Sequence, residues 1–347
     1  MGCGMLLTRA FVSQKNKDGA KSLTRLLEVS DLTVNFNTDR GKVQALDKVN
    51  IYLDKGEVLA LVGESGSGKT TLGRSILNVI PSPPGEIAEG RILFQGHNIL
   101  GMKENECNAM IRGKAITLIP QDPFGSAHPL FTIGTQLRDL FKTPNRNGRE
   151  METRMMSLLH QLQLPSASDL LRKYPHELSG GQLQRIMIAA SLLPNPLLII
   201  ADEPTTSLDV TVEAQILYLV RQLVKERGVS VLFITHNLAV ASKVSDRIVV
   251  MYAGQVMEAS PTTSFFTETA HPYARKLLEC LPNREGEIKD IGGMIPNLIN
   301  PPMGCRFHPR CEEAQPQCSF VKPMLTQIAP GHWIGCHCQT VQTRMRG

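Results

Sequence analysis

Hydrophobic and polar residues alternate from Leu26 to Phe36, which is the pattern of a strand with one buried face. A glycine-bearing turn in TDRGKVQAL leads to KVNIYL, which has the composition of a second strand, so the two segments predict an antiparallel hairpin. The continuous apolar run Val58–Val62 then ends in a glycine-rich loop, and apolar residues at helical spacing follow it. This order predicts a buried strand, a loop and a helix in succession.

Helical and strand patterns alternate through the rest of the chain. The segment from about Met102 to Leu193 has helical character, Leu197–Pro204 and Ser230–His236 are apolar runs of strand length, and RIVVMYAGQVMEAS favours a hairpin. Strands that alternate with helices predict an α/β fold with a largely parallel sheet. From roughly Asn283 onward, closely spaced prolines break any long element, and this loop-rich tail contains five of the eight cysteines.

Composition limits the kinds of protein that the chain can be, but it does not identify the function. The 347 residues are 42% hydrophobic and 20% charged, which is ordinary for a globular protein with one large domain and an appendage, or with two domains. No apolar run approaches the ~20 residues that span a bilayer. The apolar segment near the N-terminus is too short for a signal peptide. The net charge of +5 comes from scattered basic residues, which argues against a nucleic-acid partner. We expect residues 1–24 to be a flexible extension and the chain to stay in the cytoplasm.

The glycine-rich loop GESGSGKT, Gly63–Thr70, fits the G-x-x-x-x-G-K-[ST] pattern of a phosphate-binding loop. Glycines let successive backbone N–H groups point at phosphate oxygens, and the N-terminus of the following helix favours an anion. Lys69 brings a charge to the β and γ phosphates, and Thr70 brings a hydroxyl to Mg²⁺. The residues expected to bind ATP here are Gly63, Glu64, Ser65, Gly66, Ser67, Gly68, Lys69, Thr70 and Thr71.

The stretch LLIIADEP supplies a second half-site. Asp202, at the end of an apolar run, is placed to hold Mg²⁺ and belongs to the expected ATP-binding set, and Glu203 is placed to polarise an attacking water. The two motifs together predict an NTP hydrolase or kinase and no more, because GTPases and small-molecule kinases share them.

The stretch LSGGQ, Leu178–Gln182, resembles the signature motif of ATP-binding-cassette (ABC) ATPases. Further motifs stand in that family's order: Gln121 in LIPQDP, Ser207–Asp209 in SLD, and His236 in FITHN. The resemblance covers about residues 26–260. It implies an α/β, P-loop NTPase fold of the ABC type, with a RecA-like core, an antiparallel β-subdomain and a helical subdomain at about 102–193, inside an ATPase domain at 25–270.

The same resemblance implies a role for each motif. Glu203 would be the catalytic base, His236 would hold the attacking water near the γ-phosphate, and Gln121 would sense Mg²⁺. Phe36 stands where the family stacks an aromatic ring on adenine. The implied Mg²⁺ ligands are Thr70, Gln121 and Asp202. In a head-to-tail dimer, the residues implied to contact ATP on the opposite subunit are Ser179, Gly180, Gly181, Gln182 and Asp209.

A finer resemblance is to the ATP-binding subunits of oligopeptide and dipeptide importers. It is carried by KVQALDKVNIYLDKGEVLALVGESGSGKT, by HPYARKLLECLP and by the tail motif NPPMGCRFHPRCEEAQPQC…GHWIGCHC, within a C-terminal extension at 271–347. It implies two transmembrane permease subunits, a second ATPase subunit that is either a homologous chain or a copy of this one, and an extracytoplasmic solute-binding protein. The chain would then lie peripherally on the cytoplasmic face of the inner membrane.

Two points stay open at this level. The group imports peptides, nickel, glutathione or opines, so the solute is not chosen. The stretch QDPFGSAHPLFTIG replaces the group's more usual Ser-Leu-Asn-Pro type sequence where the family faces its permease, so the partner's identity is open as well. ABC proteins of translation or DNA repair are the competing class, but they usually carry two cassettes or a long coiled-coil insertion, and neither is visible here.

The tail cysteines allow four interpretations: a disulfide, a zinc site, an iron–sulfur cluster or free thiols. A reducing cytoplasm disfavours disulfides, and the spacing Cys305-x₅-Cys311-x₆-Cys318 is a poor match to the short ligand pairs of zinc sites. Four thiolates on irregular loops also suit a [4Fe–4S] cluster. The resemblance implies such a cluster on Cys305, Cys311, Cys318 and Cys336, with zinc as the alternative and Cys338 as a spare thiol.

Overall fold

The structure is a computed structural model that describes residues 25–140, 148–164, 166–206, 208–281 and 290–338. The extension predicted at residues 1–24 lies outside them. The described chain forms two compact units, one of residues up to 102 together with those from 235 onward, and one of residues 103–234. The second unit is therefore an insertion in the sequence of the first.

An antiparallel sheet opens the first unit, in the order β2-β1-β4-β5. Its strands are β1 (Arg25–Thr38), β2 (Gly41–Asp54), β4 (Gly85–Phe94) and β5 (His97–Asn98). β1 pairs with β2 across a two-residue turn, which confirms the predicted hairpin. β4 was not predicted, because GEIAEGRILF is mostly polar and exposed over its first half and shows no apolar alternation there.

A second set of strands in the first unit runs in the order β11-β12-β10-β9-β3. The strands are β3 (Val58–Val62), β9 (Arg247–Tyr252), β10 (Gln255–Pro261), β11 (Thr326–Ala329) and β12 (His332–Ile334). β3 and β9 are parallel, while β9-β10, β10-β12 and β12-β11 are antiparallel. The strand at β3 and the β9-β10 hairpin confirm the predictions. The tail therefore extends this sheet with a hairpin of its own.

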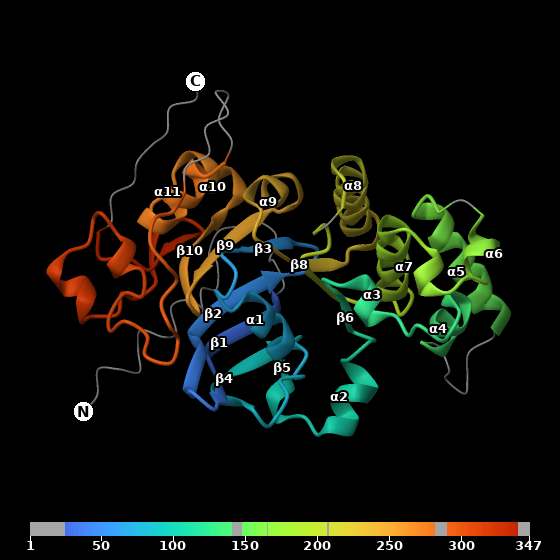
Figure 1. Ribbon diagram of the computed structural model, residues 1–347, viewed down its shortest axis with the longest axis horizontal. Coiled ribbons are helices and arrows are strands. Elements are labelled where there is room, and N and C mark those ends of the chain that lie inside the picture. The colour runs from blue at the N-terminus through green and yellow to red at the C-terminus, as the bar shows by residue number, and fades with distance from the viewer. Residues whose placement is uncertain (1–24, 141–147, 165, 207, 282–289, 339–347) are drawn as a thin grey trace. The chain divides into compact units, whose positions relative to one another are not determined.

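Short helices cover these strands. They are α1 (Lys69–Ile76), η1 (Ile99–Gly101), α9 (Leu238–Val244), α10 (Thr262–Thr267), α11 (Pro272–Glu279), η3 (His308–Arg310) and η4 (Pro316–Ser319). α10 and α11 lie against β10 (Figure 1). One apolar core joins strands and tail, since Val62, Tyr252, Tyr273 and Phe307 all belong to it.

The second unit combines three parallel strands with helices. The strands are β6 (Ile116–Ile119), β7 (Leu198–Asp202) and β8 (Ser230–Thr235). The helices are α2 (Glu104–Met110), α3 (Pro123–Ser126), α4 (Ile133–Asp139), α5 (Gly148–Gln161), α6 (Ala167–Leu170), η2 (Pro175–Glu177), α7 (Gly180–Leu192) and α8 (Val210–Arg227). α4 to α7 form the green group of helices in Figure 1.

The predicted strands at β7 and β8 are confirmed, and one part of the helical prediction is wrong. β6 interrupts the segment from Met102 to Leu193, because Ile116–Ile119 is a β-branched, mostly buried run that pairs with β7. Across the described residues, no helix is both long enough and apolar enough to pass through a membrane.

Candidate functional site

The phosphate-binding loop follows β3 and leads directly into α1. Gly63 and Gly68 have φ of +152° and +98°, which L side chains rarely adopt. A Cβ at Gly63 would lie 2.1 Å from the Met251 carbonyl oxygen, and one at Gly68 would lie 2.8 Å from that of Ala45. The glycine spacing of the motif is thus required by β9 and β2, which pack against the loop from behind.

The polar side chains of the loop turn inward. The Lys69 ammonium donates to the carbonyl oxygens of Gly63 and Glu64 at 2.8 and 2.9 Å and contacts the Ser67 hydroxyl at 3.3 Å. Lys69 is only 5% exposed, while Ser65 and Gly66 are exposed at the tip of the loop. Thr70 and Thr71 lie in the first turn of α1 and are half-buried. The loop therefore presents backbone at its tip and one buried cation at its base.

Phe36 lies at the end of β1, half-buried, between Val43 of β2 and Gly85 of β4. A Cβ at Gly85 would come within 3.0 Å of the Phe36 ring, so the missing side chain makes room for the aromatic. This contact explains the position of the ring within the antiparallel sheet. The predicted stacking on adenine stays a prediction.

The acidic pair in the second unit lies at the carboxyl end of β7. Asp202 is its last residue and is 9% exposed. Glu203 follows with φ of +47°, a left-handed conformation that is uncommon for a residue with a Cβ, and its N–H donates to the Ile234 carbonyl at 2.9 Å. Its carboxylate accepts hydrogen bonds from the Gln121 amide at 3.2 Å and the Thr206 hydroxyl at 3.0 Å. The structure therefore brings Gln121 and Glu203 into contact, while their predicted roles as magnesium sensor and catalytic base remain predictions.

The signature motif forms the N-terminus of α7. The Ser179 hydroxyl accepts from the Gln182 N–H at 3.3 Å, and the Gln182 side chain accepts from the Ser179 N–H at 3.1 Å, so the two residues form a capping box. A Cβ at Gly181 would lie 3.2 Å from Val212 of α8. Asp209 caps α8 by accepting from the Val212 N–H at 2.9 Å. Of the neighbouring motif, Ser207 lies outside the described residues.

His236 follows the last residue of β8, and its side chain is exposed. It belongs to the first unit, whereas Glu203 and Gln121 belong to the second. The predicted roles of His236, and of Thr70 and Asp202 as magnesium ligands, remain predictions.

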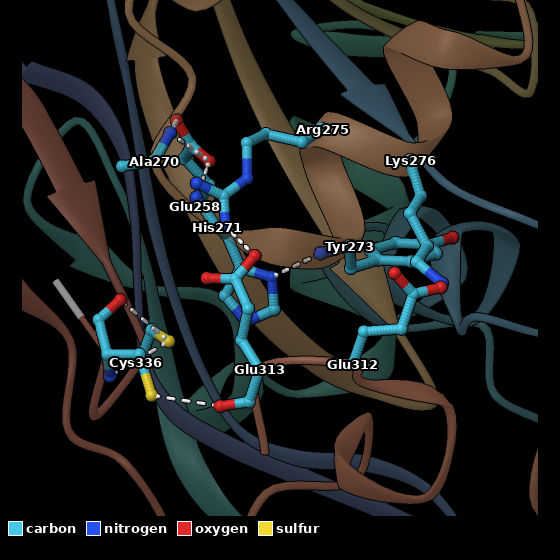
Figure 2. Close-up of polar contacts among 10 residues, drawn as sticks. Glu258, Ala270, His271, Tyr273, Arg275, Lys276, Glu312, Glu313 and Cys336 are labelled. Carbon is cyan, nitrogen blue, oxygen red and sulfur yellow. Dashed lines mark hydrogen bonds and ion pairs between the residues drawn. The ribbon is translucent and has the colours of Figure 1, made fainter. Parts of the chain in front are cut away.

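Glu258 of β10 fixes the segment that begins HPYARKLLECLP. It is fully buried and accepts hydrogen bonds from the N–H groups of Ala270 and His271 (Figure 2). Its Oε1 lies 2.8 Å from His332 Nε2. His271 Nδ1 in turn accepts from the Tyr273 N–H at 3.0 Å and caps α11. Burial, and secondarily the charge of Arg275, lower the pKa of His271 to about 3. The imidazole is therefore neutral at physiological pH.

Two residues of the C-terminal extension reach the phosphate-binding loop. The Glu64 N–H donates to the Tyr273 hydroxyl at 3.1 Å. The Glu64 carboxylate accepts from Arg310 Nη1, which lies 3.2 Å from each carboxylate oxygen. The sequence pattern places Glu64 in the loop, but it indicates no role for Tyr273 or Arg310. No local pattern connects positions 64 and 310, so only the fold reveals the pair.

The tail cysteines lie near one another. Burial first, and the neighbouring Cys318 and Cys311 in addition, raise the pKa of Cys305 to about 11, and burial together with Cys338 and Cys305 raises that of Cys336 to about 12. The Cys338 thiol donates to the Glu313 carbonyl oxygen at 3.2 Å. Crowded thiols of this kind suit a thiophilic metal in their chemistry. Within the described residues, however, no three His, Cys, Asp or Glu side chains are placed as ligands of one ion, so the predicted cluster is not supported by the geometry.

Two family models match the chain. The model described as ABC transporter matches residues 46–206, and the model described as the C-terminal region of oligopeptide/dipeptide transporters matches residues 257–318. The oligopeptide transport ATP-binding protein OppD of Bacillus subtilis is 42% identical over 317 residues, covering 90% of this chain and 88% of its own. The chain belongs to the ATP-binding subunits of oligopeptide and dipeptide ABC transporters.

Further relatives of this ABC subunit support the family assignment. The dipeptide transport ATP-binding protein DppD of B. subtilis is 38% identical over 321 residues, 91% of this chain and 96% of its own. Among solved structures, a dimeric post-hydrolysis state of the cassette MJ0796 with ADP and Pi matches with a TM-score of 0.61 and 27% identity, over 68% of this chain and 99% of that one. The cassette cbiO1 of Clostridium perfringens matches with a TM-score of 0.60 and 26% identity, over 70% and 91% of the two chains. The predicted fold and ATPase class are thus confirmed.

Proposed function

We propose that this ATPase subunit powers the import of di- or oligopeptides, or of a related small solute such as nickel, glutathione or an opine. The observation that carries the proposal is the C-terminal region at residues 257–318, which matches the oligopeptide/dipeptide transporter model. An ABC cassette alone would leave the solute class open. The tail narrows it to one group of transporters and leaves the choice within that group to the permease and the solute-binding protein.

In the proposed reaction the loop residues 63–71 bind the triphosphate through backbone N–H groups, and Lys69 shares its three N–H donors between loop carbonyls and phosphate oxygens. Bound Mg²⁺ would offset negative charge on the β and γ phosphates, with Thr70, Asp202 and Gln121 as the residues that hold it. Glu203 polarises the attacking water, and His236 keeps that water in line. Phe36 stacks on the adenine.

We further propose that two copies of the cassette, or this chain and a homologous one, close head to tail around two ATP molecules. Ser179, Gly180, Gly181 and Gln182 would then meet the γ-phosphate on the opposite subunit, because the N-terminus of α7 is suited to an anion. Asp209 would lie at the same interface. Closure follows ATP binding, and hydrolysis releases it.

Two permease subunits are the proposed membrane partners, which would place the subunit on the cytoplasmic face of the inner membrane. Apolar side chains around α3 support a docking surface: Phe124, Leu130 and Phe131 are 46%, 76% and 50% exposed. They lie in QDPFGSAHPLFTIG, the stretch that departs from the group's usual sequence. The departure is therefore expected to match a complementary change in the permease.

The function is tested by reconstituting the subunit with the permease genes found beside its own, in liposomes loaded with ATP. We expect ATP-dependent uptake of a labelled tripeptide and stimulation of ATPase activity by a cognate solute-binding protein. Uptake of nickel but not of the tripeptide would move the solute assignment within the group. Full ATPase activity without uptake of any of the proposed solutes, with every predicted component present, would contradict the import function.

A [4Fe–4S] cluster on Cys305, Cys311, Cys318 and Cys336 is retained as a proposal that rests on the family resemblance alone. Bound metal would tie together loops that have little core of their own. Anaerobic purification followed by iron, sulfide and zinc analysis tests it. About four irons per chain, lost in a Cys318→Ser variant and kept in Cys338→Ser, is the expected result. A colourless protein with one zinc, or with no metal, would contradict the cluster.

A further inference from the structure

Glu64 places a carboxylate in the loop that is expected to bind phosphates. The loop has one cation of its own, Lys69, and the Glu64 carboxylate lies five residues before it in the sequence. This carboxylate offsets the positive charge of Lys69 and repels the triphosphate. The structure resolves this conflict with a residue from the tail. Arg310 donates to both oxygens of the Glu64 carboxylate, so the loop and the tail together keep a net positive charge.

The Arg310 guanidinium is fixed by contacts other than the one with Glu64, so its position does not depend on the loop. Its side chain is 5% exposed, and all three of its guanidinium nitrogens are engaged. Nε donates to the Gly292 carbonyl at 2.9 Å, Nη2 to that of Ile291 at 2.7 Å, and Nη1 also lies 3.2 Å from the Tyr252 hydroxyl. A guanidinium fixed on three sides has little rotational freedom left to lose on binding a carboxylate.

Aromatic side chains of the apolar core pack next to the Arg310–Glu64 pair. The ring centroids of Tyr252 and Tyr273 are 4.7 Å apart, and that of Phe307 lies 5.2 Å and 5.1 Å from them. Tyr273 also accepts the Glu64 N–H, so both the main chain and the side chain of Glu64 are held by residues of the C-terminal extension. The second position of the phosphate-binding loop is therefore fixed from outside the ATP-binding cassette motifs.

We propose that Arg310 is a positioning residue for nucleotide binding: through Glu64 it holds the phosphate-binding loop in shape and cancels the one carboxylate in that loop. This role concerns ATP affinity and is independent of which solute the transporter carries. Loss of Arg310 frees Glu64 to repel the triphosphate and to compete for Lys69, while the groups that catalyse hydrolysis are unchanged.

The experiment measures the Kd of a fluorescent ATP analogue with Mg²⁺, together with KM and kcat for ATP, on the full chain. Arg310→Met is expected to raise Kd and KM about tenfold and to change kcat less than about threefold. Arg310→Lys is expected to recover most of the affinity, because the charge remains. Arg275→Met is the matched control, since that arginine has a 10% exposed side chain and pairs with Glu313 within the extension.

The decisive arm is the double variant Arg310→Met with Glu64→Gln. The double variant lacks the Glu64 carboxylate as well, so we expect it to bind the analogue at least threefold tighter than Arg310→Met alone. If Arg310 only stabilised the fold, removing the carboxylate would not restore this affinity. A double variant that binds no tighter, or an Arg310→Met effect no larger than that of Arg275→Met, would overturn the proposal. Should Arg310→Met fail to fold, Arg310→Gln, which also removes the charge, and its double variant with Glu64→Gln carry the same comparison. Wild-type protein that binds no ATP would instead contradict the ATP site itself.

Discussion

The two halves of the ATP machinery are held in opposite ways. The phosphate-binding loop is packed from behind by backbone at Met251 and Ala45 and is tied to the extension through Tyr273 and Arg310. The residues proposed to act in hydrolysis, Gln121 and Glu203, are joined by one exposed side-chain hydrogen bond, and Glu203 has a left-handed backbone. The contrast suggests that the loop is built to receive nucleotide as it stands, whereas the hydrolytic residues are built to rearrange.

The largest expected effect tests the hydrolytic half. Glu203→Gln should lower kcat about 10³-fold while ATP affinity changes little, because the amide keeps the contacts of the side chain but cannot act as a base. The closed dimer should then accumulate with ATP in size-exclusion chromatography. Thr206→Ala, which removes only a hydrogen bond to the carboxylate, is the control and should cost less than about tenfold. Wild-type turnover in Glu203→Gln would remove Glu203 from the base role.

The next effect tests how Glu258 holds the segment that carries Tyr273, the residue that accepts the Glu64 N–H. Glu258→Ala should reduce the free energy of unfolding by about 3 kcal/mol, because two buried N–H groups and His332 lose their acceptor. Glu258→Gln keeps an acceptor oxygen and should cost about 1 kcal/mol. Urea unfolding measures both. Equal and small losses would show that this buried carboxylate does not hold the HPY segment in place.

A smaller effect tests the fit of the loop itself. Gly63→Ala should lower the free energy of unfolding by about 2 kcal/mol and weaken ATP binding, because the new methyl meets the Met251 carbonyl and shifts the loop. Gly56→Ala is a matched control, since Gly56 also has a positive φ, of +73°, but its Cβ would meet nothing within 4 Å. Gly56→Ala should cost about 1 kcal/mol and leave ATP binding intact. Similar behaviour of the two variants would argue against close packing behind the loop.

The smallest effect is a pH dependence. The pKa of His271 falls from 6.5 to about 3 on folding, so the unfolded chain binds the extra proton between these values and stability decreases as the pH falls through that window. Between pH 7 and 5.5 the wild type should lose about 1 kcal/mol more than His271→Asn, which keeps a capping acceptor for the Tyr273 N–H. Urea midpoints at the two pH values measure the difference. Parallel losses in both proteins would mean that His271 is not buried in its neutral form.

The sequence predicted the parts of the molecule whose signal is local. β3, its loop and α1 are recognisable because an apolar run, a glycine spacing and a helical pattern follow one another, and β7 is recognisable in the same way. β6 was missed because a four-residue strand lay among helices, and β12 because His332–Ile334 is too short to show a period. The contact of Arg310 with Glu64 joins residues 246 positions apart, and no local pattern encodes such a pair.

The position of Arg310 has a consequence for the tail. If the tail favours nucleotide binding, then by thermodynamic reciprocity bound nucleotide must favour the ordered tail by the same factor. Arg310 directly precedes Cys311 in the sequence. A chemical change at the cysteines would then alter ATP affinity, and bound ATP would alter the stability of the segment that carries the cysteines. A segment that first looks like an appendage to the ATPase would then report on the supply of ATP, and its amide hydrogens should exchange more slowly when ATP is bound.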